Sequence, residues 1–267
     1  MEEIVGLIAG SGSLPIVTAQ EAKGRGYKVV AVAIEGETSK ELEGYVDRIH
    51  WIHLGQLGRL IEALKGEGVR QAVMIGKIPM THLFSDVRPD LRAALLYLKL
   101  KDRRGDAILA ALAEELLADG ITLLDSTTFL NPLLVEKGVL TMRCPDQREW
   151  EDIAFGWKVA KAVAHLSIGQ TVVVKDLVVL AVEAIEGTDA TIRRGGELGR
   201  EGAVVVKVSR PDHDMRFDVP VVGMETITSL KEARATVLAL EAGKALLLDK
   251  EEIIRAADGI GVAIVAQ

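Results

Sequence analysis

The densest group of residues that could do chemistry lies late in the chain, between Asp214 and Asp218. If this stretch is an extended strand, both carboxylates and Arg216 share one face, while Met215 and Phe217 point to the core. Two close carboxylates repel each other, and a divalent cation such as Mg²⁺ would relieve that repulsion. A guanidinium beside the cation could grip a phosphate. The segment therefore predicts a metal-assisted phosphoryl site or, alternatively, an Asp-Arg-Asp ion-pair ladder at a strand edge.

A glycine-rich loop near the N-terminus is the second candidate. The run Gly10-Ser11-Gly12-Ser13 follows an apolar stretch and precedes a helix-like segment. Glycines at this position let backbone N–H groups approach a phosphate at a helix N-terminus. The dinucleotide fingerprint is incomplete, because Pro15 stands where Gly or Ala is needed, and proline suits the first turn of a helix without any ligand. The loop indicates a nucleotide or phosphate ligand rather than NAD.

Two further polar turns follow predicted strands. Lys77 comes directly after Gly76, at the carboxyl edge where open α/β sheets bind ligands, and it either contacts a phosphate or is a solvated turn lysine. The run Asp125-Ser126-Thr127-Thr128 also follows an apolar stretch, and its hydroxyl groups could bind a sugar or cap a helix. Neither turn is specific by itself.

Acidic residues also gather between Glu183 and Asp189, where the chain leaves an apolar strand and turns. Thr188 and Asp189 fit the N-cap of a helix, which needs no ligand. Glu183 lies on the apolar strand, where an unpaired carboxylate is costly. We therefore expect a metal ion, Arg193 or Arg194 as its partner.

Alternating strand and helix patterns must position these residues in the first half of the chain. Such alternation is typical of a parallel sheet with crossover helices, so we expect an α/β fold with a Rossmann-like N-terminal domain over residues 1–130. The sequence predicts strands at 4–9, 28–34, 49–54, 71–75 and 121–125, and helices at 14–25, 57–65, 91–101 and 107–118.

The second half has a different pattern, which predicts a C-terminal mixed α/β domain over residues 149–267 that carries the catalytic groups. Two apolar runs, 171–175 and 177–185, join at a Lys-Asp turn and predict a hairpin. Asn131-Pro132, Gly138 and Cys144-Pro145 interrupt the chain without a periodic segment, so we place a linker at 131–148. The sequence further predicts helices at 150–166 and 228–240 and strands at 203–208, 216–222, 245–248 and 261–265.

The composition argues against several classes of protein. The 267 residues are 49% hydrophobic and carry 32 basic against 39 acidic side chains, a net charge of −7 without the basic excess of a nucleic-acid binder. The single cysteine, Cys144, cannot form an internal disulfide and fits a reducing compartment, so we expect a cytoplasmic protein. Charges interrupt the apolar runs before the ~20 residues of a spanning helix, so we expect any membrane contact to be peripheral.

Four short segments, in this order along the chain, resemble the LpxI family of UDP-2,3-diacylglucosamine pyrophosphatases. They are Ala-Gly-Ser-Gly-Ser-Leu-Pro at 9–15, Gly-Lys-Ile at 76–78, Val-Glu-Ala-Ile-Glu-Gly-Thr-Asp at 182–189 and Asp-Met-Arg-Phe-Asp-Val-Pro at 214–220. The resemblance implies a bacterial enzyme of lipid A biosynthesis that uses Mg²⁺. It implies hydrolysis of UDP-2,3-diacylglucosamine to UMP and 2,3-diacylglucosamine 1-phosphate (lipid X), with water attacking the phosphorus on the sugar side.

With this resemblance the candidate residues receive roles. We expect Asp214, Arg216 and Asp218 to be catalytic, and Asp214, Asp218 and Glu183 to hold the metal. Substrate binding is assigned to Gly10, Ser11, Gly12, Ser13, Lys77, Thr188 and Lys207. The expected partners are a lipid-linked nucleotide sugar, the inner membrane at its periphery, and a second copy of the chain in a homodimer. A non-catalytic nucleotide-sugar or phospholipid binding module and an NAD-dependent oxidoreductase are the alternatives.

Overall fold

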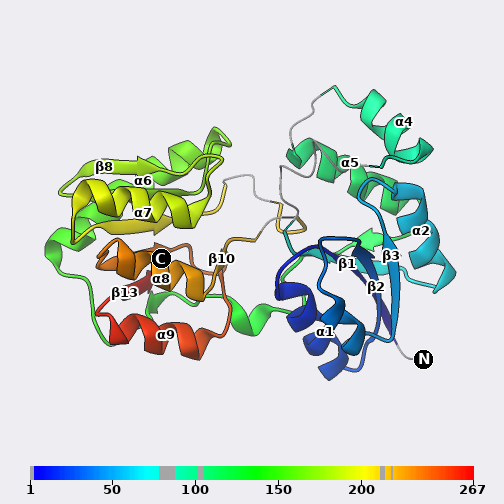
Figure 1. Ribbon diagram of the computed structural model, residues 1–267, viewed down its shortest axis with the longest axis horizontal. Coiled ribbons are helices and arrows are strands. Elements are labelled where there is room, and N and C mark those ends of the chain that lie inside the picture. The colour runs from blue at the N-terminus through cyan, green and yellow to red at the C-terminus, as the bar shows by residue number, and fades with distance from the viewer. Residues whose placement is uncertain (1–2, 78–87, 102–104, 211–213, 218) are drawn as a thin grey trace. The chain divides into compact units, whose positions relative to one another are not determined.

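The computed structural model describes residues 3–77, 88–101, 105–210, 214–217 and 219–267 (Figure 1). The chain divides into two units. Unit 1 comprises residues up to Leu130 together with the segment that begins at Asp214, and unit 2 comprises Asn131–His213 and Val219–Gln267. The α/β class expected from the sequence is confirmed in both units, which are described in turn.

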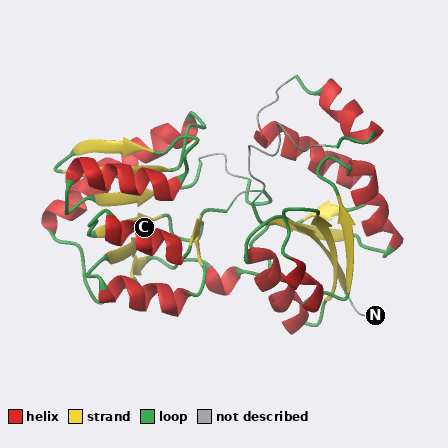
Figure 2. Ribbon diagram, viewed as in Figure 1, coloured by secondary structure: helices red, strands yellow, loops and turns green. Residues whose placement is uncertain are grey.

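Unit 1 is built on a five-stranded sheet in the order β3-β2-β1-β4-β5, with all strands parallel (Figure 2). Its strands are β1 (Ile4–Ala9), β2 (Lys28–Ile34), β3 (Arg48–Ile52), β4 (Gln71–Ile75) and β5 (Thr122–Leu123). Its helices are α1 (Leu14–Gly24), η1 (Lys40–Gly44), α2 (Leu57–Gly66), α4 (Leu91–Lys99) and α5 (Gly105–Ala118). The chain first adds β2 and β3 on one side of β1 and then β4 and β5 on the other, so its direction reverses between β1 and β4.

Hydrophobic residues on both faces of this sheet explain why the strands read as continuous apolar runs. Ile8, Val30 and Val32 lie in one core cluster with Leu60 and Leu64 of α2. The helix α1 covers the opposite face with its buried Ala19 and Ala22 (Figure 1). The core therefore fixes the carboxyl ends of β1 and β4 beside each other.

Unit 2 contains a six-stranded sheet in the order β6-β13-β11-β9-β7-β8. The central strands β9, β11 and β13 are parallel, whereas β7 is antiparallel to both of its neighbours and β6 is antiparallel to β13. Its strands are β6 (Gly138–Val139), β7 (Thr171–Lys175), β8 (Val178–Val182), β9 (Val204–Lys207), β11 (Val237–Leu240) and β13 (Ala263–Ala266). A second, two-stranded sheet pairs β10 (Val221–Val222) with β12 (Leu246–Leu247).

Helices cover both faces of the larger sheet in unit 2, as the period-two alternation of its strands requires. Val204 and Val206 of β9 share a core cluster with Ile153 and Ala160 of α6, whereas Val205 between them faces the other cluster. That second cluster receives side chains from the other three α-helices of the unit. The helices of unit 2 are η2 (Asn131–Leu133), α6 (Gln147–His165), α7 (Thr188–Gly199), α8 (Met224–Glu232) and α9 (Lys250–Gly259).

The structure differs from the sequence prediction at several places in unit 2, where helix α9 (Lys250–Gly259) was also not predicted. The helix expected over 228–240 ends at Glu232, and Val237–Leu240 is β11, because a short run with all four side chains buried suits the centre of a sheet. The expected strand over 216–222 is reduced to β10. Residues 131–148 do not form a free linker, because they contain η2 and β6, and β6 pairs with β13.

The described helices include none long and apolar enough to cross a membrane.

Candidate functional site

The glycine loop and the lysine turn of unit 1 form one structure at the carboxyl ends of β1 and β4. The N–H of Gly10 donates to the carbonyl of Ile75 at 2.8 Å. Ser11 and Lys77 exchange two backbone hydrogen bonds, of 2.8 and 3.1 Å, and the Ser11 hydroxyl donates to the Lys77 carbonyl at 2.7 Å. Because the strand order reverses between β1 and β4, this is the position at which open α/β sheets bind ligands.

Two glycines permit this close approach of the two chain segments. A Cβ on Gly10 would lie 2.8 Å from the Lys77 carbonyl oxygen, and one on Gly76 would lie 2.7 Å from the Gly10 carbonyl carbon. Gly76 also has a φ of +103°, a conformation that other residues rarely adopt. The close approach of the two segments therefore explains why both positions are glycine, without any ligand.

Gly12 and Ser13 differ from Gly10, because they present an open surface. Gly12 has a φ of +93°, a Cβ placed on it would meet no described atom within 4 Å, and both residues are exposed. Ser13 is the N-cap of α1, and its side chain makes no capping hydrogen bond. Pro15 removes one N–H donor from the first turn. The backbone around Gly12 and Ser13 therefore remains the accessible part of the loop, next to the exposed Lys77.

The late acidic segment contributes to this same edge of unit 1, although it lies beyond residue 149 in the sequence. Ser126 follows β5, and its N–H donates to the Met215 carbonyl at 2.9 Å. The Ser126 hydroxyl lies 2.6 Å from the Met74 carbonyl oxygen and 2.8 Å from that of Arg216, and it can donate to either. The ring of Phe217 packs against the core of unit 1. The buried Ser126 thus anchors the segment beside the end of β4.

This segment is a turn and not the extended strand that we expected. In this turn the side chains of Asp214 and Arg216 are hydrogen-bonded to each other. Both carboxylate oxygens of Asp214 accept from the guanidinium, at 2.6 to 3.1 Å, and one also accepts from the Arg216 N–H at 3.1 Å. The Asp214 carboxylate raises the pKa of Arg216 above its usual value through these hydrogen bonds. Asp218 lies outside the described residues.

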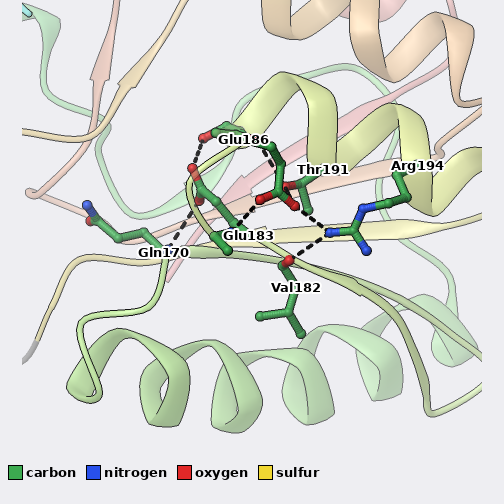
Figure 3. A network of polar contacts seen from close by, with 9 residues as sticks. Gln170, Val182, Glu183, Glu186, Thr191 and Arg194 are labelled. Atoms are coloured by element: carbon green, nitrogen blue, oxygen red, sulfur yellow. Dashed lines mark hydrogen bonds and ion pairs between the residues drawn. The ribbon is translucent and has the colours of Figure 1, made fainter. Parts of the chain in front are cut away.

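Unit 2 brings together Glu183, Thr188 and Lys207, which sequence reasoning had placed in one site. One Glu183 oxygen accepts from the Thr188 hydroxyl at 3.0 Å, and the other accepts from the N–H of Gln170 at 3.1 Å (Figure 3). The ammonium of Lys207, a buried residue, donates to the Thr188 hydroxyl oxygen at 2.9 Å. These groups lie at one edge of the sheet, where β8 and β9 end and β7 begins.

The expected pairing of Glu183 with Arg193 or Arg194 is wrong. Arg194 pairs with Glu186 and donates to the Val182 carbonyl at 2.9 Å, as Figure 3 shows, while Arg193 pairs with Glu232. The Glu186 carboxylate accepts hydrogen bonds from the Glu186 N–H and from Arg194, and these hold its pKa below the usual range. Both arginines lie on α7, which begins at Thr188, and their ion pairs are with Glu186 and Glu232 instead.

A third polar group in unit 2 was missed by the sequence analysis. The Glu241 carboxylate follows β11 and accepts from Lys161 at 2.6 Å and from the N–H and hydroxyl of Ser209 at 2.8 and 3.1 Å. Burial raises the pKa of Glu241, but hydrogen bonds from Lys161, Lys244 and Ser209 outweigh it and lower the value to about 2. The predicted helix over 228–240 concealed that Glu241 stands at a strand end.

The described carboxylates are a poor fit to Mg²⁺. Among the parts of the chain that the structure describes, no three His, Cys, Asp or Glu side chains are grouped as metal ligands. Asp214 directs both oxygens at Arg216, and both oxygens of Glu183 accept hydrogen bonds. The two residues also belong to different units.

Comparison with known proteins gives matches over nearly the whole chain. A family model described as the LpxI N-terminal domain matches residues 4–133, and one described as the LpxI C-terminal domain matches residues 136–265. A protein of Caulobacter vibrioides named UDP-2,3-diacylglucosamine pyrophosphatase LpxI is 32% identical, over 97% of this chain and 96% of its own length. The solved structure of CobK precorrin-6A reductase is 13% identical over all of this chain and 87% of its own, with a TM-score of 0.30.

Proposed function

The chain belongs to the LpxI family, and we propose that it hydrolyses UDP-2,3-diacylglucosamine to UMP and 2,3-diacylglucosamine 1-phosphate in lipid A biosynthesis. The observation that carries the proposal is that both halves match the family and that a relative of almost equal length has this named activity. The chain is accordingly an enzyme, a hydrolase that acts on a phosphoric anhydride.

The reaction sets requirements that the edge of unit 1 can meet. A water molecule attacks the phosphorus on the sugar side, the anhydride bond breaks, UMP leaves, and the water oxygen remains in the phosphate of the lipid product. The pyrophosphate is anionic, so it must be bound by cations and N–H donors whose positions are fixed before it arrives. Lys77 and the accessible backbone of Gly12 and Ser13 supply such groups where β1 and β4 end.

We assign Arg216 to a phosphoryl oxygen at the same edge. Its side chain is 40% exposed, and Asp214 fixes the guanidinium from one side. The remaining N–H groups can donate to an anion. Asp214 is then a positioning residue for Arg216, and Asp218 is the candidate for orienting the water.

Glu183, Thr188 and Lys207 form the candidate polar subsite of unit 2. Glu183 fixes the Thr188 hydroxyl, which in turn accepts from Lys207. The subsite lies where β8 and β9 end and β7 begins. Its hydroxyl and ammonium groups suit the sugar phosphate or the uridine diphosphate of the substrate.

Mg²⁺ assistance is part of the proposal. When bound, such an ion would neutralise charge that develops on the phosphoryl oxygens. The described carboxylates do not form a set of ligands for Mg²⁺, so a metal-dependent reaction would require Asp218 or a rearranged Asp214.

The deciding experiment measures release of UMP and lipid X from UDP-2,3-diacylglucosamine by the purified protein, with Mg²⁺ and with EDTA. We expect turnover with Mg²⁺ and its loss with EDTA. Binding of the substrate without turnover in either condition would identify a non-catalytic binding module. Affinity for NAD without UMP release would favour the NAD-dependent oxidoreductase.

A further inference from the structure

Helix α4 (Leu91–Lys99) of unit 1 carries an exposed row of leucines that the proposed reaction does not use. Leu91, Leu95 and Leu98 are 76%, 48% and 73% exposed. At about 100° per residue, their side chains fall within about 60° of one another on the helix. They form one stripe, which we call the leucine stripe.

The opposite face of α4 holds the helix on unit 1. Ala93 and Leu96 are partly buried against the core cluster that contains α2. Asp90 caps the helix by accepting from the N–H of Ala93 at 2.9 Å, and it also accepts from the N–H of Gly58. The orientation of the leucine stripe is therefore set by packing and capping on the other side of the helix.

A groove of about 600 Å³ borders the stripe at Leu91 and Leu95. Charged side chains contribute to its lining, among them Lys65, Arg92 and Asp119. Asp119 pairs with both of these cations, so the charges within the groove are largely compensated. The groove leaves open space beside the leucines, and it does not cover them.

The charge around the leucine stripe is opposite to that of the chain as a whole. Between residues 88 and 101 there are four basic residues and one acid, whereas the whole chain carries −7. Lys99 and Lys101 are exposed, and Arg92 forms ion pairs with Glu115 and Asp119. An apolar stripe flanked by exposed lysines is the pattern of a helix that lies in the surface of an anionic bilayer.

We propose that the leucine stripe of α4, with Lys99 and Lys101, docks unit 1 on an anionic lipid bilayer. This inference rests on the proposed function, because a diacylated substrate is presented by a membrane. A second copy of the chain fits the leucine stripe less well than a bilayer does. A two-fold interface would place the same patch against itself and bring lysines of like charge together.

The test is co-sedimentation of the purified protein with vesicles of phosphatidylcholine, with or without phosphatidylglycerol, in the absence of substrate. The stripe variant combines Leu91→Gln, Leu95→Gln and Leu98→Gln. The matched control combines Leu166→Gln, Leu177→Gln and Leu198→Gln, three leucines of unit 2 that are similarly exposed but do not form a stripe. A second variant combines Lys99→Glu and Lys101→Glu.

We expect the unmodified chain and the control to bind vesicles that contain phosphatidylglycerol, with binding reduced by salt. The stripe variant should bind at least about tenfold more weakly, and the lysine variant should lose the preference for the anionic lipid. Equal binding by the stripe variant and the unmodified chain would overturn the inference. So would a dimer that the stripe substitutions convert to a monomer, because the stripe would then join two copies.

Hydrolysis of substrate dispersed in detergent separates this inference from the proposed function. All variants should turn over detergent-dispersed substrate at the unmodified rate, and only the stripe and lysine variants should be slow on substrate embedded in vesicles. If no variant hydrolyses the dispersed substrate, the proposed function fails while vesicle binding still decides the role of α4. Equal rates on embedded substrate would count against docking.

Discussion

Glu241 provides the most quantitative prediction, because its environment is buried and its pKa is strongly perturbed. Its carboxylate is 12% exposed and accepts from Lys161, Lys244 and Ser209. Lowering the pKa from 4.5 to about 2 corresponds to roughly 3 kcal/mol at about 1.4 kcal/mol per pKa unit. The partner lysines are partly solvated, so we expect Glu241→Gln to lower the free energy of unfolding of unit 2 by about 1–2 kcal/mol at neutral pH.

The pH dependence has a definite sign. The folded-state pKa is depressed, so the contribution of Glu241 is fully present above its ordinary value of 4.5 and is lost as the pH falls toward about 2. The gap between Glu241→Gln and the unmodified chain should therefore be widest near pH 7 and shrink below pH 4.5.

Urea unfolding monitored by tryptophan fluorescence can measure this gap, because Trp150 and Trp157 both lie on α6 of unit 2. The matched control is Glu232→Gln, which removes a more exposed ion pair with Arg193 and should cost less than about 1 kcal/mol at either pH. A pH-independent gap for Glu241→Gln, or a loss no larger than that of the control, would refute the reasoning.

Four further substitutions test the site in unit 1. Asp214→Ala and Asp218→Ala should each lower kcat at least about a hundredfold with little change in thermal stability, and near-native turnover would show that these acids form only ion pairs. Ser126→Ala removes the hydroxyl that anchors the 214–217 turn and should lower kcat about tenfold. The control Ser229→Ala removes a buried hydroxyl that donates to the Glu225 carbonyl in unit 2, and it should leave kcat unchanged. Equal kcat for both variants would show that the anchor is not needed. Gly10→Ala should lower the free energy of unfolding by more than about 1 kcal/mol, because the added Cβ would meet the Lys77 carbonyl. The control Gly24→Ala places its Cβ in open space and should not lower it. Equal stabilities of the two variants in thermal unfolding would contradict the close approach of Gly10 to Lys77.

The parallel sheet of unit 1 and the hairpin of unit 2 could be predicted because their strands are long, apolar and bounded by clear turns. The glycine loop and the lysine turn were likewise placed correctly at a carboxyl sheet edge. Their direct pairing could not be predicted, because it depends on the strand order, which brings β4 beside β1.

The late acidic segment shows the limit of local patterns. Alternation of Asp214, Met215, Arg216 and Phe217 fits a strand, but the tertiary contacts of Ser126 and Phe217 hold it as a turn on unit 1. Period-two reasoning assumes a ladder partner, and here the carbonyl groups are bonded to Ser126 instead. The Glu241 network was missed for a related reason, since its members come from three elements far apart in sequence.

We propose that the chain cleaves the anhydride of UDP-2,3-diacylglucosamine by attack of water on the sugar-side phosphorus. It is tested most directly by running the reaction in water enriched in heavy oxygen and analysing both products by mass spectrometry. We expect the heavy oxygen to appear in the phosphate of lipid X and to be absent from UMP. Heavy oxygen in UMP, or no products from the purified protein, would contradict it.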